Sequence, residues 1–488
     1  MGTDSLREKE HRKKLSITSF SILYILQILL VLSSLLFAGS PIAEEIMMSK
    51  DSIAQVVPAK FSVFYMATFN GFKNAMDIAI FIFMLSGFIN VVNETKALSS
   101  SLNSALNKLK GRELSLLPIL IIFFAIGGTT FGFGEETIPL YGILTAALLA
   151  AGFDTMVVLG VVLLGSGVGI VGSTINPFST GVAMDSLKGI GIDTNAGIIF
   201  GLGGIVLLLT TIVTIIYVMR YAKKVKSNMK FSILSESEYC HMNENIKIGN
   251  EEIKPLTKNQ KITMYIFGFS FLVMFISLIP WQKFNINIFD NWSNILTGEP
   301  WGQWYFGDLA MWFLSIAILI GIICKLGEKK LIEAFMQGAK DVVPVVMIIV
   351  VSRGTSVLMS ETNLDMFILD RASHLLQGVS PVIFVLGSYI IFFFLSILIP
   401  SSSGLAYVSM PIMGGLACNV GISPELMVII YVTAHGIAHL TCPTSGVLMA
   451  SIEINKISYG TWLKFVKKPV ILLISISLIV LLSANFIL

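Results

Sequence analysis

The sequence predicts an all-α polytopic membrane protein with about nine transmembrane helices and two re-entrant hairpins in an inverted structural repeat. Of its 488 residues, 55% are hydrophobic and only 13% are charged, a composition that excludes an ordinary soluble protein. Apolar runs of about 20 residues recur, and that length lets a helix cross the hydrocarbon layer. Two proline breaks in long apolar helices, at Pro177 and Pro443, differ by 266 positions. Paired broken helices of this kind are typical of secondary transporters.

Two apolar segments, 115–152 and 379–418, are interrupted near their middles by 127–136 and 400–404. Glycine, serine and proline end helices, so we expect each half to be too short to cross and each segment to form a re-entrant hairpin. Nine other segments are expected to span the membrane: 17–38, 72–94, 154–188, 196–220, 261–281, 306–325, 341–359, 424–453 and 469–488.

The basic residues predict the orientation. With a cytoplasmic N-terminus, 26 of the 33 Lys and Arg residues fall on the cytoplasmic side, as the positive-inside rule requires. Five of them, between Arg7 and Lys14, precede the first apolar run, which also resembles a secretory signal peptide. The run is long for a signal core, so a retained first helix is favoured. The net charge of +3 is carried by these loops, and no nucleic-acid partner is expected.

Three regions are expected along the chain. Residues 1–220 form a first membrane half, with hairpin 115–152 and broken helix 154–188. Residues 221–260 are polar and form a cytoplasmic connecting loop. Residues 261–488 form a second half, with hairpin 379–418 and broken helix 424–453. The predicted topology gives the two halves opposite orientations, which would bring two hairpin tips and two helix breaks to one central point.

Three motifs carry a family resemblance: 127–132 followed by Glu135 and Glu136, then 152–154, then Asn176-Pro177-Phe178. With them the chain resembles the bacterial YfcC-type carriers of the ion transporter superfamily, from about residue 15 to 488. The resemblance implies a carrier of C4-dicarboxylates or an antiporter of basic amino acids such as arginine and ornithine. It also implies the bacterial cytoplasmic membrane, a homodimer with a scaffold domain and an elevator-like transport domain, and no cofactor beyond Na⁺ or H⁺ as coupling ion.

Glu135 and Glu136 are adjacent carboxylates in an otherwise apolar hairpin, where burial of charge is costly. They are candidates for attracting a cationic substrate or for binding Na⁺ or H⁺. Alternatively, one of them caps the second hairpin helix. Arg353 lies inside a predicted span and needs a partner. It either clamps a substrate carboxylate or pairs with Glu135, Glu136 or a helix C-terminus as part of the scaffold.

Hydroxyl and amide side chains gather at both breaks and both hairpin tips, where they suit Na⁺ or a polar substrate. The alternative is that they satisfy backbone groups freed by proline. The candidate substrate-binding residues are Thr129, Thr130, Glu135, Glu136, Asn176, Arg353, Ser401, Ser402, Ser403 and Thr444. The candidate ion-binding residues are Ser173, Thr174, Thr441 and Ser445.

His435 and His439 lie four residues apart on one helix face. No further ligand accompanies them, so no metal site is expected, and packing histidines are favoured over a proton relay. The sequence favours a secondary transporter of small charged metabolites, foremost an arginine/ornithine antiporter. The alternative is Na⁺- or H⁺-coupled dicarboxylate uptake, which needs more than one positive group. An intramembrane serine protease built on Ser166 lacks a supporting motif, so an enzyme is not expected.

Overall fold

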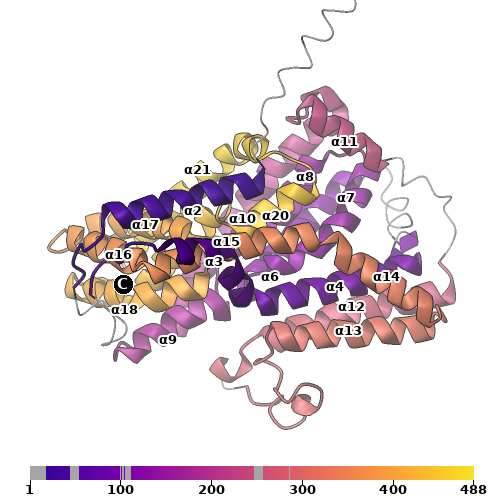
Figure 1. The fold of residues 1–488 in the computed structure, drawn as a ribbon. Coiled ribbons are helices and arrows are strands. Elements are labelled where there is room, and N and C mark those ends of the chain that lie inside the picture. Colours follow the sequence, from indigo (N-terminus) through magenta and orange to yellow (C-terminus); the bar gives the residue numbers. More distant parts are fainter. Residues whose placement is uncertain are drawn as a thin grey trace, which may run out of the picture.

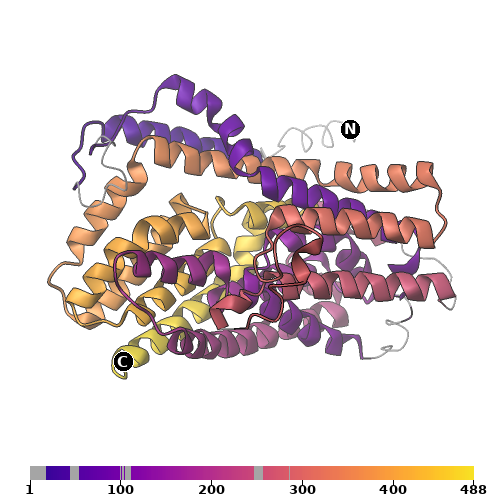
Figure 2. The ribbon, with the colours of Figure 1, turned by 90° about the horizontal axis from the view of Figure 1, so that it is seen from below.

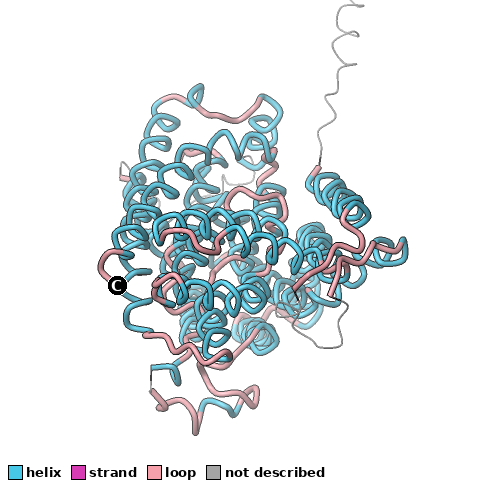
Figure 3. Tube along the Cα trace, turned by 90° about the vertical axis from the view of Figure 1, so that its left-hand side faces the viewer, coloured by secondary structure: helices cyan, strands magenta, loops and turns pink. Residues whose placement is uncertain are grey.

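The predicted all-α class is confirmed. The computed structural model describes residues 18–43, 54–98, 100–101, 104, 112–246, 256–284 and 286–488, and that part of the chain is helices and loops without a named strand (Figure 3). The basic residues between Arg7 and Lys14 lie outside it. Within it, nine helices are long and apolar enough to cross a membrane.

The helices have the following bounds. They are α2 (Ser19–Leu36), α3 (Phe61–Asn74), α4 (Met76–Glu94), α6 (Leu116–Phe131), α7 (Tyr141–Ala150), α8 (Thr155–Val171), α9 (Val182–Gly189), α10 (Ala196–Ser227), α11 (Glu236–Ile246), α12 (Lys258–Leu278), α13 (Phe306–Ile323), α14 (Glu328–Asp341), α15 (Val343–Glu361), α16 (Leu364–Leu375), α17 (Pro381–Leu398), α18 (Ser402–Asn419), α19 (Pro424–His439), α20 (Gly446–Ile454) and α21 (Tyr459–Asn485). Short turns η2 (Glu113–Ser115), η3 (Glu135–Leu140) and η4 (Pro177–Gly181) lie between them.

Side-chain caps fix where several of these helices begin. Asp154 accepts a hydrogen bond of 2.9 Å from the backbone N–H of Val157 at the start of α8. Thr257 and Gln260 form a reciprocal capping box at the start of α12. Such caps satisfy backbone donors that the first helical turn leaves unpaired. The polar residues between the apolar runs therefore define the helix ends.

The long apolar helices differ in part from the predicted spans. Seven predicted spans coincide with them, but 154–188 and 424–453 are each divided into two shorter helices. Two helices reach span length instead: Glu113–Phe131, which joins η2 to α6, and α17. These are the first arms of the two predicted hairpins. The premise that both halves of each hairpin are too short is therefore wrong for the first arms.

Both interruptions fall at the sequence breaks. α8 ends at Val171, and a π-helical turn starts at Pro177 before α9. α19 ends at His439, and α20 starts at Gly446, after Pro443. Proline lacks a backbone N–H and so weakens a helix, and the chain is unwound just before Pro177 and around Pro443.

Contacts of α10 show the course of the segment 113–154, which holds the turn between α6 and α7. The Lys226 amine lies 2.7 Å from the Glu113 carboxylate, next to the start of α6. The Tyr221 hydroxyl donates a 2.6 Å hydrogen bond to Asp154, just after α7. The segment from 113 to 154 therefore begins and ends beside the same end of α10. A re-entrant hairpin requires this course, while its depth in a membrane stays a prediction.

The two halves have closely matched helix bounds. α14 and α15 begin and end 267 positions after α3 and α4, and α17 ends 267 positions after α6. This displacement differs by one residue from the 266 of the two prolines. With the displacement of 267 positions, Gly87 corresponds to Gly354, and Ser86 corresponds to Arg353. The inverted relation of the halves stays a prediction.

Two groups of helices border the centre of the molecule. α4 packs on α13 and α14, and α15 packs on α2 and α3. α6, α8, α10, α19 and α21 pack together in the other group, with α17 against α19. In Figure 1, α4, α12, α13 and α14 lie together at the right, while α16, α17 and α18 lie at the left. α20 and η3 contact α15 and α4, and so link the two groups.

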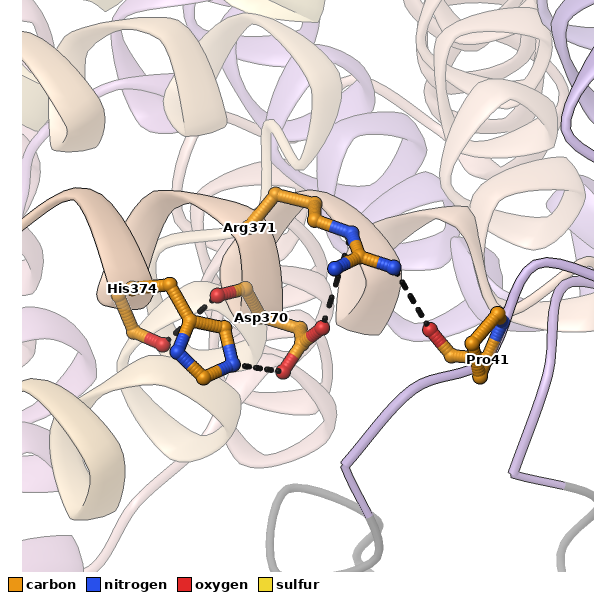
Figure 4. Close-up of polar contacts among 5 residues, drawn as sticks. Pro41, Asp370, Arg371 and His374 are labelled. Carbon is orange, nitrogen blue, oxygen red and sulfur yellow. Dashed lines mark hydrogen bonds and ion pairs between the residues drawn. The ribbon is translucent and has the colours of Figure 1, made fainter.

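Two connections between helices lie at the surface of the molecule. The chain between α12 and α13 projects below α13 in Figure 1 and lies in front of the helices in Figure 2. On α16, the Arg371 guanidinium donates a 3.2 Å hydrogen bond to the carbonyl oxygen of Pro41 (Figure 4). Arg371 and His374 both lie beside the buried carboxylate of Asp370. These contacts attach the chain between α2 and α3 to the second half.

Candidate functional site

A cavity of about 110 Å³ lies where the turn between α6 and α7 (the first turn), the turn between α17 and α18 (the second turn), the two helix breaks and α15 meet. It is bordered by the chain just before η3 and at its start, by residues 400–403, and by parts of α8, α13 and α19. Eight of the fourteen candidate residues line it: Glu135, Glu136, Asn176, Arg353, Ser401, Ser402, Ser403 and Ser445. The structure thus brings together segments more than 200 residues apart, although the binding roles of these residues stay predictions.

The first turn is built around two glycines. α6 ends at Gly132, whose φ of +81° is a left-handed conformation that glycine adopts without a steric penalty. The backbone N–H of Gly134 then donates a 3.1 Å hydrogen bond to Glu136 Oε2. Glu136 is buried, whereas Glu135 is partly exposed. One carboxylate oxygen therefore supports the turn, and both side chains still border the cavity.

Asn176 holds the first break against this turn. Its side-chain oxygen accepts a 2.9 Å hydrogen bond from the backbone N–H of Phe178 and so caps the π-helical turn. A Cβ atom at position 132 would lie 2.9 Å from the Asn176 amide nitrogen, so a larger residue there would displace this side chain. The amide thus has a local structural role as well as a place at the cavity.

The other hydroxyls of the first half bond to the backbone. Thr129 Oγ1 donates to the carbonyl oxygen of Gly172 at 2.6 Å and accepts from the backbone N–H of Thr174 at 3.1 Å. Thr130 Oγ1 donates to the Ile126 carbonyl at 2.8 Å, and Ser173 Oγ donates to the Ile170 carbonyl at 2.8 Å. The candidate residues Thr129, Thr130, Ser173 and Thr174 all lie outside the cavity lining. Their contacts match the alternative in which hydroxyls satisfy backbone groups freed at the break.

The second turn is attached to α19. The Tyr431 hydroxyl donates a 2.5 Å hydrogen bond to the carbonyl oxygen of Ser402. His439 Nε2 lies 2.8 Å from the carbonyl oxygen of Pro400, and His435 Nδ1 lies 3.0 Å from Ser396 Oγ. Three side chains on one helix thus position the turn whose serines border the cavity.

The second break is held by neighbours on both sides. Thr441 Oγ1 donates back to the Ile437 and Ala438 carbonyls, and the Thr441 carbonyl accepts from the Tyr459 hydroxyl at 2.5 Å. The Ser352 hydroxyl donates to the carbonyl oxygen of Thr444. Thr441 and Thr444 lie outside the cavity lining, whereas Ser445 lies in it.

Arg353 reaches the cavity from α15. Among the described residues, it takes part in no ion pair within 4 Å and in no hydrogen bond, so the predicted scaffold pairing with a hairpin glutamate is not formed. An unpaired guanidinium beside two carboxylates in one small cavity gives the site separate positive and negative groups.

Three aromatic residues of the cavity lining were not predicted from the sequence. Phe178, Tyr305 and Phe306 border the cavity, and the rings of Phe178 and Phe306 stack with centroids 6.0 Å apart. Phe178 belongs to the Asn-Pro-Phe motif, which could have indicated it. Tyr305 follows the chain between α12 and α13, and no local pattern marks it. His435 and His439 also border the cavity, although packing roles were favoured for them.

Several known proteins are similar to this chain. The sequence profile described as the C4-dicarboxylate anaerobic carrier, DcuC, matches residues 15–485. An uncharacterized protein of Haemophilus influenzae is 32% identical over 397 residues, covering 81% of this chain and 73% of its own length. A putative basic amino acid antiporter of Escherichia coli, YfcC, is 22% identical over 407 residues, covering 80% of this chain and 74% of its own length.

Two solved structures are also similar. Neisseria gonorrhoeae MtrF, described with a class of antimetabolite efflux pumps, has a TM-score of 0.44 at 15% identity and covers 99% of this chain and 98% of its own. The YdaH transporter of Alcanivorax borkumensis has a TM-score of 0.45 at 11% identity and covers 96% of this chain and 98% of its own.

Proposed function

This chain belongs to the C4-dicarboxylate anaerobic carrier family, and on that premise we propose that it exchanges basic amino acids, arginine and ornithine, by alternating access. Membership makes the chain a multi-pass membrane transporter. One observation carries the choice of substrate: Arg353 borders the same cavity as Glu135 and Glu136 and is paired with neither. The Escherichia coli relative described as a basic amino acid antiporter supports the same choice.

The charges match the two ends of such a substrate. A planar guanidinium binds a carboxylate through two parallel hydrogen bonds, so Arg353 suits the α-carboxylate of an amino acid. Glu135 and Glu136 suit its cationic side chain. Arginine and ornithine differ in length but carry both charge signs, so one site accepts either in turn.

The small cavity supports a mechanism that opens and closes. Sites for small molecules typically enclose about 300–1,000 Å³, and this cavity is smaller at about 110 Å³. We propose that the surrounding turns or helices move as an amino acid enters. The helices are interrupted at the two turns and the two breaks, so these four segments are the ones best suited to move.

Coupled uptake of a C4-dicarboxylate is the second candidate, favoured by the description of the family. Two carboxylates and one arginine border the cavity. A dianionic substrate would therefore need Na⁺ or H⁺ to neutralise the glutamates, and that coupling is part of this candidate.

We further propose a homodimer in the bacterial cytoplasmic membrane with a cytoplasmic N-terminus.

Uptake of labelled arginine into proteoliposomes tests the proposal. Vesicles loaded with ornithine are compared with vesicles loaded with succinate and with empty vesicles under a Na⁺ or H⁺ gradient. We expect uptake only when ornithine is inside. Uptake of labelled succinate, with no movement of arginine in any vesicle, would replace exchange by the dicarboxylate function.

A further inference from the structure

The two histidines of α19 make different use of their ring nitrogens. The rings of His435 and His439 lie 4.3 Å apart, centroid to centroid, and both border the cavity. Each ring has one nitrogen that donates and one that accepts when it is neutral, and the hydrogen-bond partners decide which is which. The partners of these rings can be assigned from the heavy-atom positions.

His435 carries its proton on Nδ1. Ser396 Oγ donates its only hydrogen to the carbonyl oxygen of Phe392 at 2.6 Å. The contact of 3.0 Å between Ser396 Oγ and His435 Nδ1 therefore has the ring nitrogen as donor. In the neutral ring Nε2 then holds a lone pair and acts as an acceptor.

His439 has the opposite tautomer and no nitrogen left over. Its Nε2 lies 2.8 Å from the carbonyl oxygen of Pro400, which can only accept, so Nε2 carries the proton. Its Nδ1 lies 3.5 Å from Ser445 Oγ, which accepts from the backbone N–H of Leu448 and has its own hydrogen to give. Both nitrogens of His439 are thus directed at protein groups.

His435 Nε2 is left for a ligand. No described residue forms a hydrogen bond with it, yet it is not among the fully enclosed polar atoms that lack a partner. The residue as a whole is only 1% exposed. The free space that His435 borders is the cavity shared with Glu136 and Arg353.

We infer that His435 Nε2 accepts a hydrogen bond from the guanidinium or ammonium group of the substrate. A lone pair attracts an N–H donor and repels a carboxylate, so the atom selects the cationic end of a basic amino acid. This inference rests on the proposed function and adds a specificity-determining residue to it. His439, by contrast, is a positioning residue for the second turn.

Two substitutions separate the two nitrogens of His435. His435→Asn places an amide near the position of Nδ1, so it keeps a donor for Ser396 but loses the acceptor. His435→Gln places an amide oxygen near the position of Nε2 and restores the acceptor. His374→Asn is the matched control, because His374 lies on α16 and does not border the cavity. Binding of arginine is measured by calorimetry on the purified full-length protein at about pH 8, where free imidazole is neutral.

We expect His435→Asn to weaken arginine binding about tenfold or more, the usual effect of losing a hydrogen bond to a charged group. His435→Gln should recover most of the affinity, and His374→Asn should leave it unchanged. Equal affinity of the wild-type protein and a folded His435→Asn variant would overturn the inference and leave the exchange function standing. A wild-type protein that binds succinate and no arginine would overturn both.

A second measurement does not depend on the folding of any variant. In wild-type protein labelled with nitrogen-15 histidine, arginine should shift the Nε2 resonance of a ring protonated on Nδ1. Resonances of the ring with the opposite tautomer should move less. An unchanged Nε2 resonance at saturating arginine would also overturn the inference.

Discussion

His439 Nε2 donates a 2.8 Å hydrogen bond to the carbonyl oxygen of Pro400, which joins the end of α19 to the turn between α17 and α18. The last carbonyls of a helix have no partner within it, and this one follows the end of α17. A side chain from another helix thus closes the turn that presents Ser401, Ser402 and Ser403 to the cavity.

The first prediction concerns the stability of this turn. His439→Asn is too short to reach Pro400 and should lower the free energy of unfolding by about 1–3 kcal/mol, the cost of an unpaired buried acceptor. His439→Gln retains a donor near the position of Nε2 and should lose less. Thermal unfolding of the purified variants measures the difference. Equal losses in the two variants would contradict the assigned bond.

The sequence predicted the breaks but not their partners. Pro177 and Pro443 mark the unwound segments because proline removes a backbone donor wherever it occurs. Glu135, Glu136 and Arg353 were identified because charge in an apolar run is costly, whatever its surroundings. These signals are local, so they can be read from one chain without knowledge of its packing.

The rest of the site depends on tertiary contacts. The sequence around Thr129 does not indicate that its hydroxyl donates to the carbonyl oxygen of Gly172, at the end of α8. Tyr305 borders the cavity beside the first break, where its ring packs on that of Phe178 with centroids 5.5 Å apart. Thr129 and Ser403 both carry a hydroxyl group and both lie next to a glycine in the sequence. This local sequence does not indicate that Thr129 bonds to the backbone while Ser403 borders the cavity.

The second prediction tests the two glutamates. Glu135→Gln and Glu136→Gln each replace a carboxyl group at the cavity with a neutral amide and should raise the half-saturating arginine concentration about tenfold or more. The amide introduced by Glu136→Gln retains an oxygen that can accept from Gly134, so the turn should still form. Arginine exchange in proteoliposomes is the measurement, and Glu299→Gln on the exposed loop is the control. Unchanged half-saturation in both cavity variants would remove the charge argument for a cationic substrate.

The third prediction assigns Arg353 to the substrate carboxylate. Arg353→Gln should weaken competition by arginine about tenfold or more, since a charge-assisted pair is lost. It should leave competition by agmatine, which has the guanidinium but no carboxylate, nearly unchanged. Arg353→Lys should be intermediate, because an ammonium group cannot form the planar two-bond pair. Equal losses for arginine and agmatine would mean that Arg353 acts on the fold or on the cationic end.

The fourth prediction concerns the contact between α6 and α8. A Cβ atom on Gly169 would collide with the carbonyl oxygen of Ala125 and lie 2.7 Å from Gly128 Cα. Backbone atoms cannot yield as side chains do, so Gly169→Ala should separate the helices and lower the thermal stability clearly. Gly160→Ala is the matched control on the same helix, because its Cβ would meet only the Val218 and Phe465 side chains, at 3.2 Å and beyond. Similar melting temperatures for the two variants would contradict the close approach of the backbones.

The fifth prediction is a pH dependence of stability in the connecting loop. Glu238 on α11 is buried, and burial alone raises the pKa of a carboxyl group. Hydrogen bonds from the backbone N–H groups of Ser458 and Ser235, and from the hydroxyls of Ser235 and Thr461, outweigh it and hold the pKa of Glu238 below its usual value. The ionised carboxylate thus links the loop to the start of α21.

A lowered pKa in the folded state fixes the sign of this effect. The stabilisation is fully present above the unfolded-state pKa, near 4.5, and is lost as the pH falls through the lower pKa of the folded state. Glu238→Gln removes the charge at every pH. The wild-type protein should therefore melt above this variant at about pH 7, and the gap should narrow as the pH falls below about 4.5. Thermal unfolding of both proteins across this range is the measurement, and a gap that stays constant or widens toward acid would show that the carboxylate charge does not hold the loop to α21.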